Sequence, residues 1–194
     1  MESNKKEGGI VQLVVVLGLI TLVCALLLGV ANGVTAPKIE QNAIDTRNAA
    51  MAEIIADATF TDAEVPDEYA NPSDKNAAVV TGLYKAEKDG QDAGYCVEVG
   101  PKGFGGTVTM IVGINADGTV AGAKVTAHAE TPGLGAKSQT DTAWIAQYQG
   151  QPADGSLAVT KDGGSIVPIT GATITSRAVT KGVNTAAQLV ASLG

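Results

Sequence analysis

An uncharged apolar segment near the N-terminus, from Ile10 to Val34, places the tightest limit on how this chain can fold. A helix of about 25 residues, rising about 1.5 Å per residue, spans the roughly 30 Å hydrocarbon core of a bilayer. A signal peptide has a shorter apolar core of roughly 7–15 residues, and Pro37 is unfavourable for cleavage after Ala36. We therefore predict a retained transmembrane helix over residues 10–34, preceded by a short N-terminus over residues 1–9.

The charges on either side of the apolar segment predict its orientation. Lys5 and Lys6 precede it, whereas the other flank offers only Lys38, which stands beside Glu40. Basic flanks stay on the cytoplasmic side of a membrane. We therefore expect a single-pass protein of the cell membrane with a cytoplasmic N-terminus and residues 35–194 on the extracytoplasmic face.

Charge and cysteine content exclude several classes of partner. The formal net charge is -7, and because the acids and bases before residue 35 cancel, all of it belongs to residues 35–194. Nucleic-acid binding needs Lys and Arg to neutralise phosphates, so no nucleic-acid partner is expected. Cys24 lies in the apolar segment and Cys96 in a predicted strand. They are expected in different media, so we predict neither an internal disulfide nor a metal site.

Residues 35–76 are predicted to connect the membrane helix to a folded domain. From Pro37 to about Ala58 the apolar residues recur near a period of 3.6, which indicates a helix with the proline in its first turn. Residues 59–76 are acidic and contain two prolines. That composition is typical of a loop.

Residues 77–194 are predicted to form a single α+β domain, a mostly antiparallel sheet with flanking helices. Alternating apolar residues separated by turn residues indicate hairpins. The predicted strands cover residues 78–86 and 94–99, 107–114 and 119–127, and 157–160 and 165–167. A short amphipathic helix is predicted over residues 140–149. A closing helix from about Ser176 to Leu193 has an apolar stripe that can pack on the sheet.

The residues that suggest chemistry lie at the start of the closing helix, in the string Thr170-Gly171-Ala172-Thr173-Ile174-Thr175-Ser176-Arg177. Gly171 permits a turn with positive φ, and the hydroxyl side chains follow it. Free N–H groups and the positive end of the helix dipole make such a junction an anion site, and Arg177 and Lys181 on one face favour a bound phosphate. An ordinary capped helix start with solvated cations would use the same residues, and the pattern leaves both interpretations open.

Two strings of residues resemble a known family. Thr170-Gly171-Ala172-Thr173 resembles the Ser/Thr-Gly-Ala-Thr flavinylation motif of the FMN-binding domain family. Glu130-Thr131-Pro132-Gly133-Leu134-Gly135 is similar to the loop that the family places against the isoalloxazine ring. The resemblance implies that Thr173 carries FMN as a phosphoester installed by a flavin transferase that uses FAD. In the family an acidic residue often stands three positions before the motif; here that position is Val167, and Asp162 is the nearest acid upstream.

The resemblance also implies roles for other residues of both strings. The implied cofactor-binding residues are Thr170, Gly171, Ala172, Thr173, Thr175, Ser176 and Arg177 at the attachment site and Glu130, Thr131, Gly133, Leu134, Gly135 and Lys137 in the loop. Glycines let backbone N–H groups approach a flat ring, and Leu134 can cover its face. Glu130 and Thr131 can bond ring edges or the ribityl chain, and Lys137 can pair with phosphate or reduced flavin. Solvated charges at Glu130 and Lys137 and a packing role for Leu134 are the ordinary alternatives.

Residues 78–194, together with the anchor, resemble the G subunits of Rnf-type complexes. This resemblance implies a membrane-anchored covalent flavoprotein that relays electrons within an ion-translocating ferredoxin:NAD oxidoreductase, a redox subunit rather than an enzyme on its own. The implied partners are the other membrane, iron–sulfur and flavin subunits. Two alternatives remain: the equivalent C-type subunit of a Na⁺-pumping NADH:quinone reductase, and a cofactor-free pilin-like surface protein. Pilins normally carry a Glu early in the apolar run, and this chain has none there.

Overall fold

The computed structural model describes residues 3–193, and the chain divides into two compact units, one up to Asp45 and one from Thr46 onward. Helix α1 (Ser3–Ile54) belongs to both units and contains Pro37 in its interior. From Gly9 on it is long and apolar enough to cross a membrane, with a mean hydropathy of 3.0 in its most apolar window. The side chains of Lys5 and Lys6, on which the predicted orientation rests, lie outside the described part.

The membrane helix and the predicted connecting helix form one continuous element, because α1 runs through Pro37 without interruption. A proline inside a helix removes one backbone hydrogen bond, and the flanking apolar and helix-forming residues sustain the helix here despite that loss. The helix also ends at Ile54 rather than near Ala58, and Asp57 follows with a positive φ of 62°. The left-handed residue ends the helical path.

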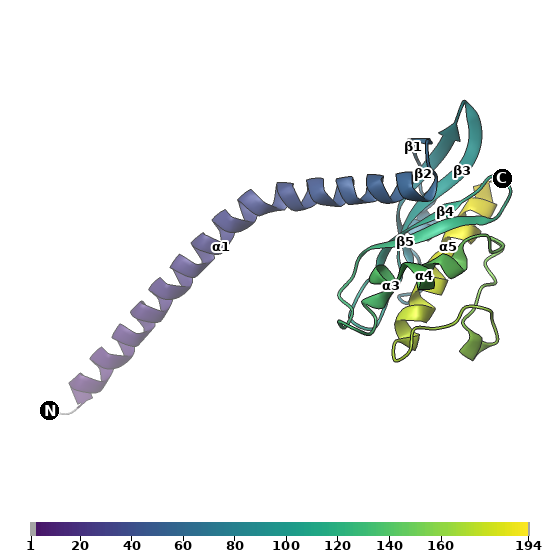
Figure 1. Cartoon of the computed structure of the whole chain (residues 1–194). Helices are drawn as coiled ribbons and strands as arrows, with labels where there is room; N and C mark the ends of the chain where they lie inside the picture. Colours follow the sequence, from purple (N-terminus) through teal and green to yellow (C-terminus); the bar gives the residue numbers. More distant parts are fainter. Residues whose placement is uncertain (1–2, 194) are drawn as a thin grey trace. The chain divides into compact units, whose positions relative to one another are not determined.

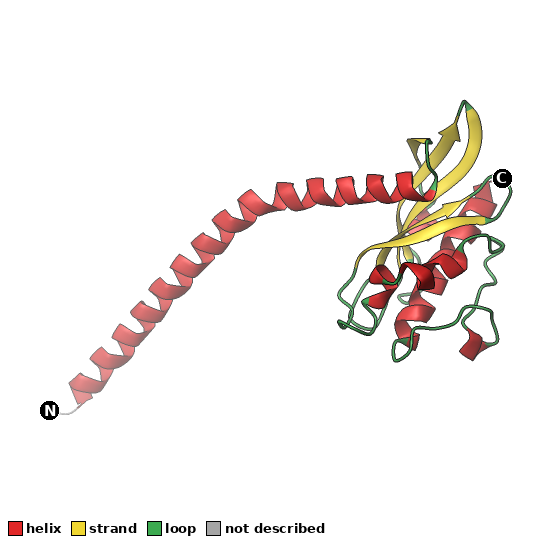
Figure 2. Cartoon of the chain, in the orientation of Figure 1, coloured by secondary structure: helices red, strands yellow, loops and turns green. Residues whose placement is uncertain are grey.

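The second unit contains a five-stranded antiparallel sheet whose strands follow one another in chain order (Figures 1 and 2). The strands are β1 (Thr59–Ala63), β2 (Val79–Lys88), β3 (Gln91–Gly100), β4 (Thr109–Ile114) and β5 (Val120–Ala127). The hairpins β2–β3 and β4–β5 confirm the prediction from alternating residues. The predicted loop over residues 59–76 is partly wrong, since it holds β1 and the single turn α2 (Asp67–Ala70).

Both faces of the sheet are covered. Helix α5 (Thr173–Leu193) packs against one face, where Val179 and Val183 join Val112 in the larger core cluster. The end of α1 packs against the other face, where Met51 and Ile111 belong to a second cluster. A Cβ on Gly113 would lie 2.4 Å from Ile54 Cγ2, so this helix end requires a glycine on β4.

Cys96 lies fully buried in the second cluster, unpaired, and burial raises the pKa of its thiol to about 12. Cys24 is exposed on α1 and is also free. The prediction of two cysteines without a disulfide is confirmed. Cys96 therefore acts as a packing residue, because an inert thiol is typical of an apolar environment.

The segments between β5 and α5 differ from the predicted elements. The predicted helix over residues 140–149 corresponds to α4 (Thr142–Ile145) followed directly by the 3₁₀ turn η1 (Ala146–Tyr148), and a separate turn, α3 (Lys137–Thr140), precedes it. The break between α3 and α4 lies at Asp141, whose extended backbone lets its carboxylate accept the N–H of Trp144 and start a new helix. A cap residue of this kind interrupts a helix that periodicity alone would continue.

The predicted hairpin of residues 157–160 with 165–167 is also wrong. A single parallel bridge joins Val159 to Ile166 around the 3₁₀ turn η2 (Thr160–Asp162). Gly163, with φ of 88°, ends this turn. The 3₁₀ turn and the left-handed Gly163 leave the segments around Val159 and Ile166 parallel to each other, so they do not form an antiparallel hairpin.

Candidate functional site

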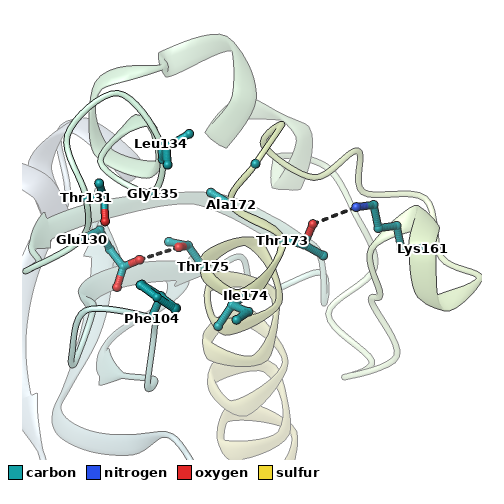
Figure 3. A pocket seen from close by; sticks show the side chains of 11 residues that line it. Phe104, Glu130, Thr131, Leu134, Gly135, Lys161, Ala172, Thr173, Ile174 and Thr175 are labelled. Carbon is teal, nitrogen blue, oxygen red and sulfur yellow. Dashed lines mark hydrogen bonds between the residues drawn. The ribbon is translucent and has the colours of Figure 1, made fainter.

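A cavity of about 360 Å³ lies where the loop after β5 faces the first turn of α5 (Figure 3). Its lining residues are Phe104, Glu130, Thr131, Leu134, Gly135, Lys161, Gly171, Ala172, Thr173, Ile174 and Thr175. The structure thus brings together the two strings that the sequence singled out. It also adds Phe104, Lys161 and Ile174, which sequence reasoning missed. The volume is within the range of small-molecule and cofactor sites.

Thr173 is the first residue of α5, three positions earlier than the predicted helix start. Its side chain lines the cavity, and Thr173 Oγ1 accepts a 3.0 Å hydrogen bond from Lys161 Nζ. The first N–H groups of a helix have no partner within the helix and suit an anion. Thr173 therefore combines a hydroxyl at the cavity, a neighbouring cation and a helix N-terminus.

The other hydroxyls of the motif are differently placed. Thr175 and Ser176 are 1% and 0% exposed. Ser176 Oγ donates to the Ala172 carbonyl and accepts from the Ile169 N–H, which holds the turn before α5. Thr175 Oγ1 donates to Glu130, and Thr170 is exposed and does not line the cavity. Thr175 and Ser176 are thus buried with structural partners, whereas Thr173 lines the cavity and is partly exposed.

Glu130 forms the opposite wall and is 5% exposed. Its Oε2 accepts from Thr175 Oγ1, and its Oε1 accepts from the Gly105 N–H at 2.8 Å. A Cβ on Gly103 would lie 2.4 Å from Oε1, and one on Gly135 would lie 2.5 Å from Oε2. These glycines leave room for the carboxylate, which ties the loop to α5 and is directed at protein groups rather than at a ring edge.

Apolar side chains border the cavity on several sides. Phe104, Leu134 and Ile174 are 72%, 43% and 51% exposed. Gly171, with φ of 79°, carries the chain past Leu134, and a Cβ there would lie 3.0 Å from Leu134 Cδ2. Exposed large apolar residues gathered at a cavity are typical of a ligand site. They suit the faces of a flat aromatic group.

The cations predicted for phosphate lie away from the cavity lining. Arg177 donates to both carboxylate oxygens of Asp162, Nε at 2.7 Å and Nη2 at 2.6 Å. These bonds hold the pKa of the Asp162 carboxyl below its ordinary value. Lys181 Nζ donates to the Asn76 carbonyl, and Lys137 is exposed at the start of α3.

The predicted residue Gly133 and two neighbours of the cavity walls, Trp144 and His128, have structural positions. Gly133 adopts a positive φ of 75° in the exposed part of the loop. The indole of Trp144 is buried, packs edge-on against Tyr148 and donates a 2.7 Å hydrogen bond to the Val167 carbonyl. His128 Nδ1 accepts the Glu130 N–H. These contacts fix the two segments that carry the cavity walls.

The donor set of the cavity fits FMN. A hydroxyl and a lysine stand at one end for a phosphate, and apolar side chains border the rest for a flat ring. Among the described residues no group of three His, Cys, Asp or Glu side chains could hold a metal ion. The arrangement therefore matches a phosphorylated aromatic cofactor in the chemistry of its lining.

Comparison with known proteins adds independent findings. The FMN-binding domain family matches residues 103–188. The G subunit of the Na⁺-translocating ferredoxin:NAD⁺ oxidoreductase complex of Acetobacterium woodii is 37% identical, over 94% of this chain and 92% of that protein. The G subunit of the ion-translocating oxidoreductase complex of Erwinia tasmaniensis is 33% identical over 94% and 88%. The G subunit of the proton-translocating ferredoxin:NAD⁺ oxidoreductase complex of Clostridium ljungdahlii is 30% identical over 98% and 96%.

Proposed function

The chain belongs to the family of G subunits of ion-translocating oxidoreductase complexes, and on that premise we propose that it carries FMN covalently on Thr173. It is a membrane-anchored redox subunit that relays electrons among the other subunits of its complex. The relatives include complexes named for Na⁺ and for protons. The proposal therefore concerns the electron relay and assigns no coupling ion.

The placement of the motif hydroxyls is the observation that carries the assignment to Thr173. Thr173 and Thr175 both line the cavity, but the Thr175 hydroxyl is buried and donates to Glu130, and Ser176 is buried and donates to the Ala172 carbonyl, whereas Thr173 is partly exposed. A phosphoester can form only at a hydroxyl that a phosphate can reach. Thr173 meets this condition next to the apolar walls that would receive the ring.

The chain's own residues hold and orient the cofactor. Bound FMN supplies the electron-transfer chemistry. Thr173 fixes the phosphate end, and Leu134, Ile174 and Phe104 offer apolar surface to the ring. Glu130 and Thr175 keep the wall of the cavity in place through their buried hydrogen bond. The protein thereby sets the position of the flavin toward its redox partners.

A separate flavin transferase is part of the proposal. A threonine hydroxyl is a weak nucleophile unless a base activates it. The side chain that contacts Thr173 Oγ1 is a lysine, which donates to it. We infer that an enzyme using FAD supplies the base, while this chain presents the hydroxyl.

The test is co-expression of the full-length chain with a flavin transferase. We expect a band that fluoresces under ultraviolet light on a denaturing gel and a mass increase equal to FMN less one water. Thr173→Val removes the hydroxyl and should give a dark band of unmodified mass, whereas Thr173→Ser keeps a hydroxyl and should be modified. Covalent flavin on the Thr173→Val protein would refute the assignment and direct peptide mapping to Thr175 or Ser176.

We also propose that the N-terminus is cytoplasmic and that the FMN-binding domain is extracytoplasmic, because Lys5 and Lys6 precede the apolar segment. In a Cys24→Ser background, Ser73→Cys would place an exposed thiol on the domain. A membrane-impermeant maleimide should label it in intact spheroplasts. Labelling only after lysis would reverse the proposed orientation.

The G-subunit assignment is favoured over the alternatives that the sequence left open. The relatives compared above are G subunits aligned over most of their length, which favours this assignment over the corresponding subunit of a quinone reductase. The FMN-binding domain match at residues 103–188 argues against a cofactor-free pilin-like protein.

A further inference from the structure

We propose that Lys161 binds the phosphate of the flavin attached to Thr173 and is held in position by the ion pair between Asp162 and Arg177. The inference deepens the proposed function and rests on the covalent attachment proposed above. It assigns a phosphate-binding role to a residue twelve positions before the attachment residue. The hydrogen bond between Lys161 Nζ and Thr173 Oγ1 is its starting point (Figure 3).

Lys161 lies on a well-defined turn. The 3₁₀ turn η2 (Thr160–Asp162) is closed by the bridge between Val159 and Ile166, with the Thr160 N–H donating to the Ile166 carbonyl at 2.8 Å. A Cβ on Gly164 would lie 2.0 Å from the Ala158 carbonyl oxygen, so the two sides of the turn are in close contact. This packing directs Lys161 toward the cavity.

Charge also points to Lys161. Among the described residues that line the cavity, it is the one that carries a positive charge. An ammonium group has three N–H donors, and the contact with Thr173 uses one of them. Arg177 donates to Asp162 and Lys181 to the Asn76 carbonyl. Lys161 therefore has donors to spare at the position where a phosphate on Thr173 would begin.

The neighbouring ion pair fixes the turn to α5. Asp162 directly follows Lys161, and Arg177 follows Thr173 by four residues, which is about one helical turn. Arg177 donates two hydrogen bonds to the Asp162 carboxylate, a planar, bidentate arrangement that defines orientation. The ion pair and the Lys161–Thr173 hydrogen bond thus lie side by side, and both connect η2 to the beginning of α5.

The attachment reaction shows where the charge of Lys161 would act. The Thr173 Oγ–H bond breaks and an Oγ–P bond forms to the FMN phosphorus of FAD, while the bond from that phosphorus to the bridging oxygen breaks. AMP leaves with the electron pair, and the proton passes to a base of the transferase. A positioned cation stabilises the charge on the phosphoryl oxygens during transfer and on the phosphodiester afterwards.

The experiment compares Lys161→Gln with Lys161→Arg and with Lys85→Gln, a matched change at a half-exposed lysine on β2, away from the cavity. Full-length proteins made without transferase are incubated with purified transferase and FAD, and modification is followed by intact mass. We expect attachment to Lys161→Gln to be about tenfold slower. Lys161→Arg should restore most of the rate, and Lys85→Gln should match the wild type.

A second measurement separates a phosphate contact from an effect on the transferase alone. The ³¹P resonance of the phosphodiester in the modified fraction should shift in Lys161→Gln and remain unchanged in Lys85→Gln. An unchanged resonance would overturn the inference, even if attachment were slow, and so would a wild-type rate. If attachment were slow only in Lys137→Gln, the result would overturn the inference and support Lys137, which the sequence suggested, as the phosphate ligand. Failure of the wild type to be modified would refute the proposed function itself.

Discussion

Two carboxylates fasten loops to the first turns of α5, and they do so in opposite environments. Glu130 is 5% exposed and is bonded to Thr175 and the Gly105 N–H. The side chain of Asp162 is 40% exposed and is bonded to Arg177. Thr173 and Thr175, two residues apart, lie on different sides of the helix, so their contacts with Lys161 and Glu130 border the cavity from different directions (Figure 3).

The difference in burial predicts that one carboxylate contributes to the stability of the domain and the other to the placement of a side chain. Hydrogen bonds to a buried charge are costly to break, because each group that loses its partner stays without water. An exposed ion pair competes with water and contributes little to stability. We conclude that Glu130 maintains the wall of the cavity, whereas Asp162 determines where its neighbour Lys161 points.

The largest expected effect is that of Glu130→Ala. It leaves Thr175 Oγ1 and the Gly105 N–H without their buried acceptor, which should lower the free energy of unfolding by about 3 kcal/mol. Urea unfolding of the full-length protein in detergent, followed by the fluorescence of the single tryptophan Trp144, measures it. Glu130→Gln retains an amide oxygen and should lose less; equal stability of Glu130→Ala and the wild type would contradict the structural role.

An intermediate effect is expected for Gly135→Ala. The new Cβ would lie 2.5 Å from Glu130 Oε2 and 2.7 Å from Thr175 Oγ1, so the carboxylate or the loop must move. Overpacking of this kind costs about 1–3 kcal/mol, and the same unfolding assay reports it. Gly150→Ala is an instructive control, since its Cβ meets nothing within 4 Å but its φ is 75°, so any loss there reflects backbone strain alone. A Gly135→Ala protein as stable as the wild type would contradict the expected crowding of Glu130.

The smallest expected effect on stability is that of Asp162→Asn, which weakens an exposed pair and should leave the unfolding midpoint nearly unchanged. Attachment of flavin should nevertheless slow about threefold, the size that an exposed ion pair typically contributes. Intact mass against time measures the rate. A stability loss as large as that of Glu130→Ala would remove the distinction drawn between the two carboxylates.

The pH dependence of the exposed pair follows from the same contacts. Arg177 lowers the pKa of Asp162 in the folded protein, so the pair's contribution is present above the ordinary Asp pKa and is lost as pH falls through the lower, folded value. The difference in attachment rate between wild type and Asp162→Asn should therefore stay constant between about pH 6 and 8. A difference that disappeared within this range would require another titrating group.

The regular parts of the fold could be predicted from local sequence. Strands β2 to β5 alternate apolar residues and end at turn residues, and α5 shows a helical period. Strand β1 was missed because Thr59–Ala63 is short and polar, so its composition does not indicate a strand. It lies at the sheet edge, where pairing with β2 stabilises the extended conformation. The bridge between Val159 and Ile166 was mistaken for a hairpin because the direction of pairing depends on the Gly163 turn.

In the candidate site, too, some residues could be predicted from local sequence and others could not. Both strings of the cavity were identified from sequence, since motif residues are local. Lys161 and Phe104 were not, because only the fold brings them to the cavity. Arg177 was named as a phosphate ligand for its place in the first turns of the helix and Lys137 as part of the loop, but the structure pairs Arg177 with Asp162 and leaves Lys137 exposed. The spacing of charged residues in the sequence does not predict which of them pair in the folded domain.

The chain order of the elements sets the order of assembly. Strands that follow one another in the chain pair in the sheet, so on the proposed orientation the sheet can form progressively as the chain crosses the membrane. The cavity, however, needs Phe104, residues 130–135, Lys161 and the start of α5, and α5 is the last element to be made. A complete binding surface exists only when α5 has docked on the finished sheet. The proposed flavin attachment is therefore expected to be a reaction on a folded domain and not on a nascent chain.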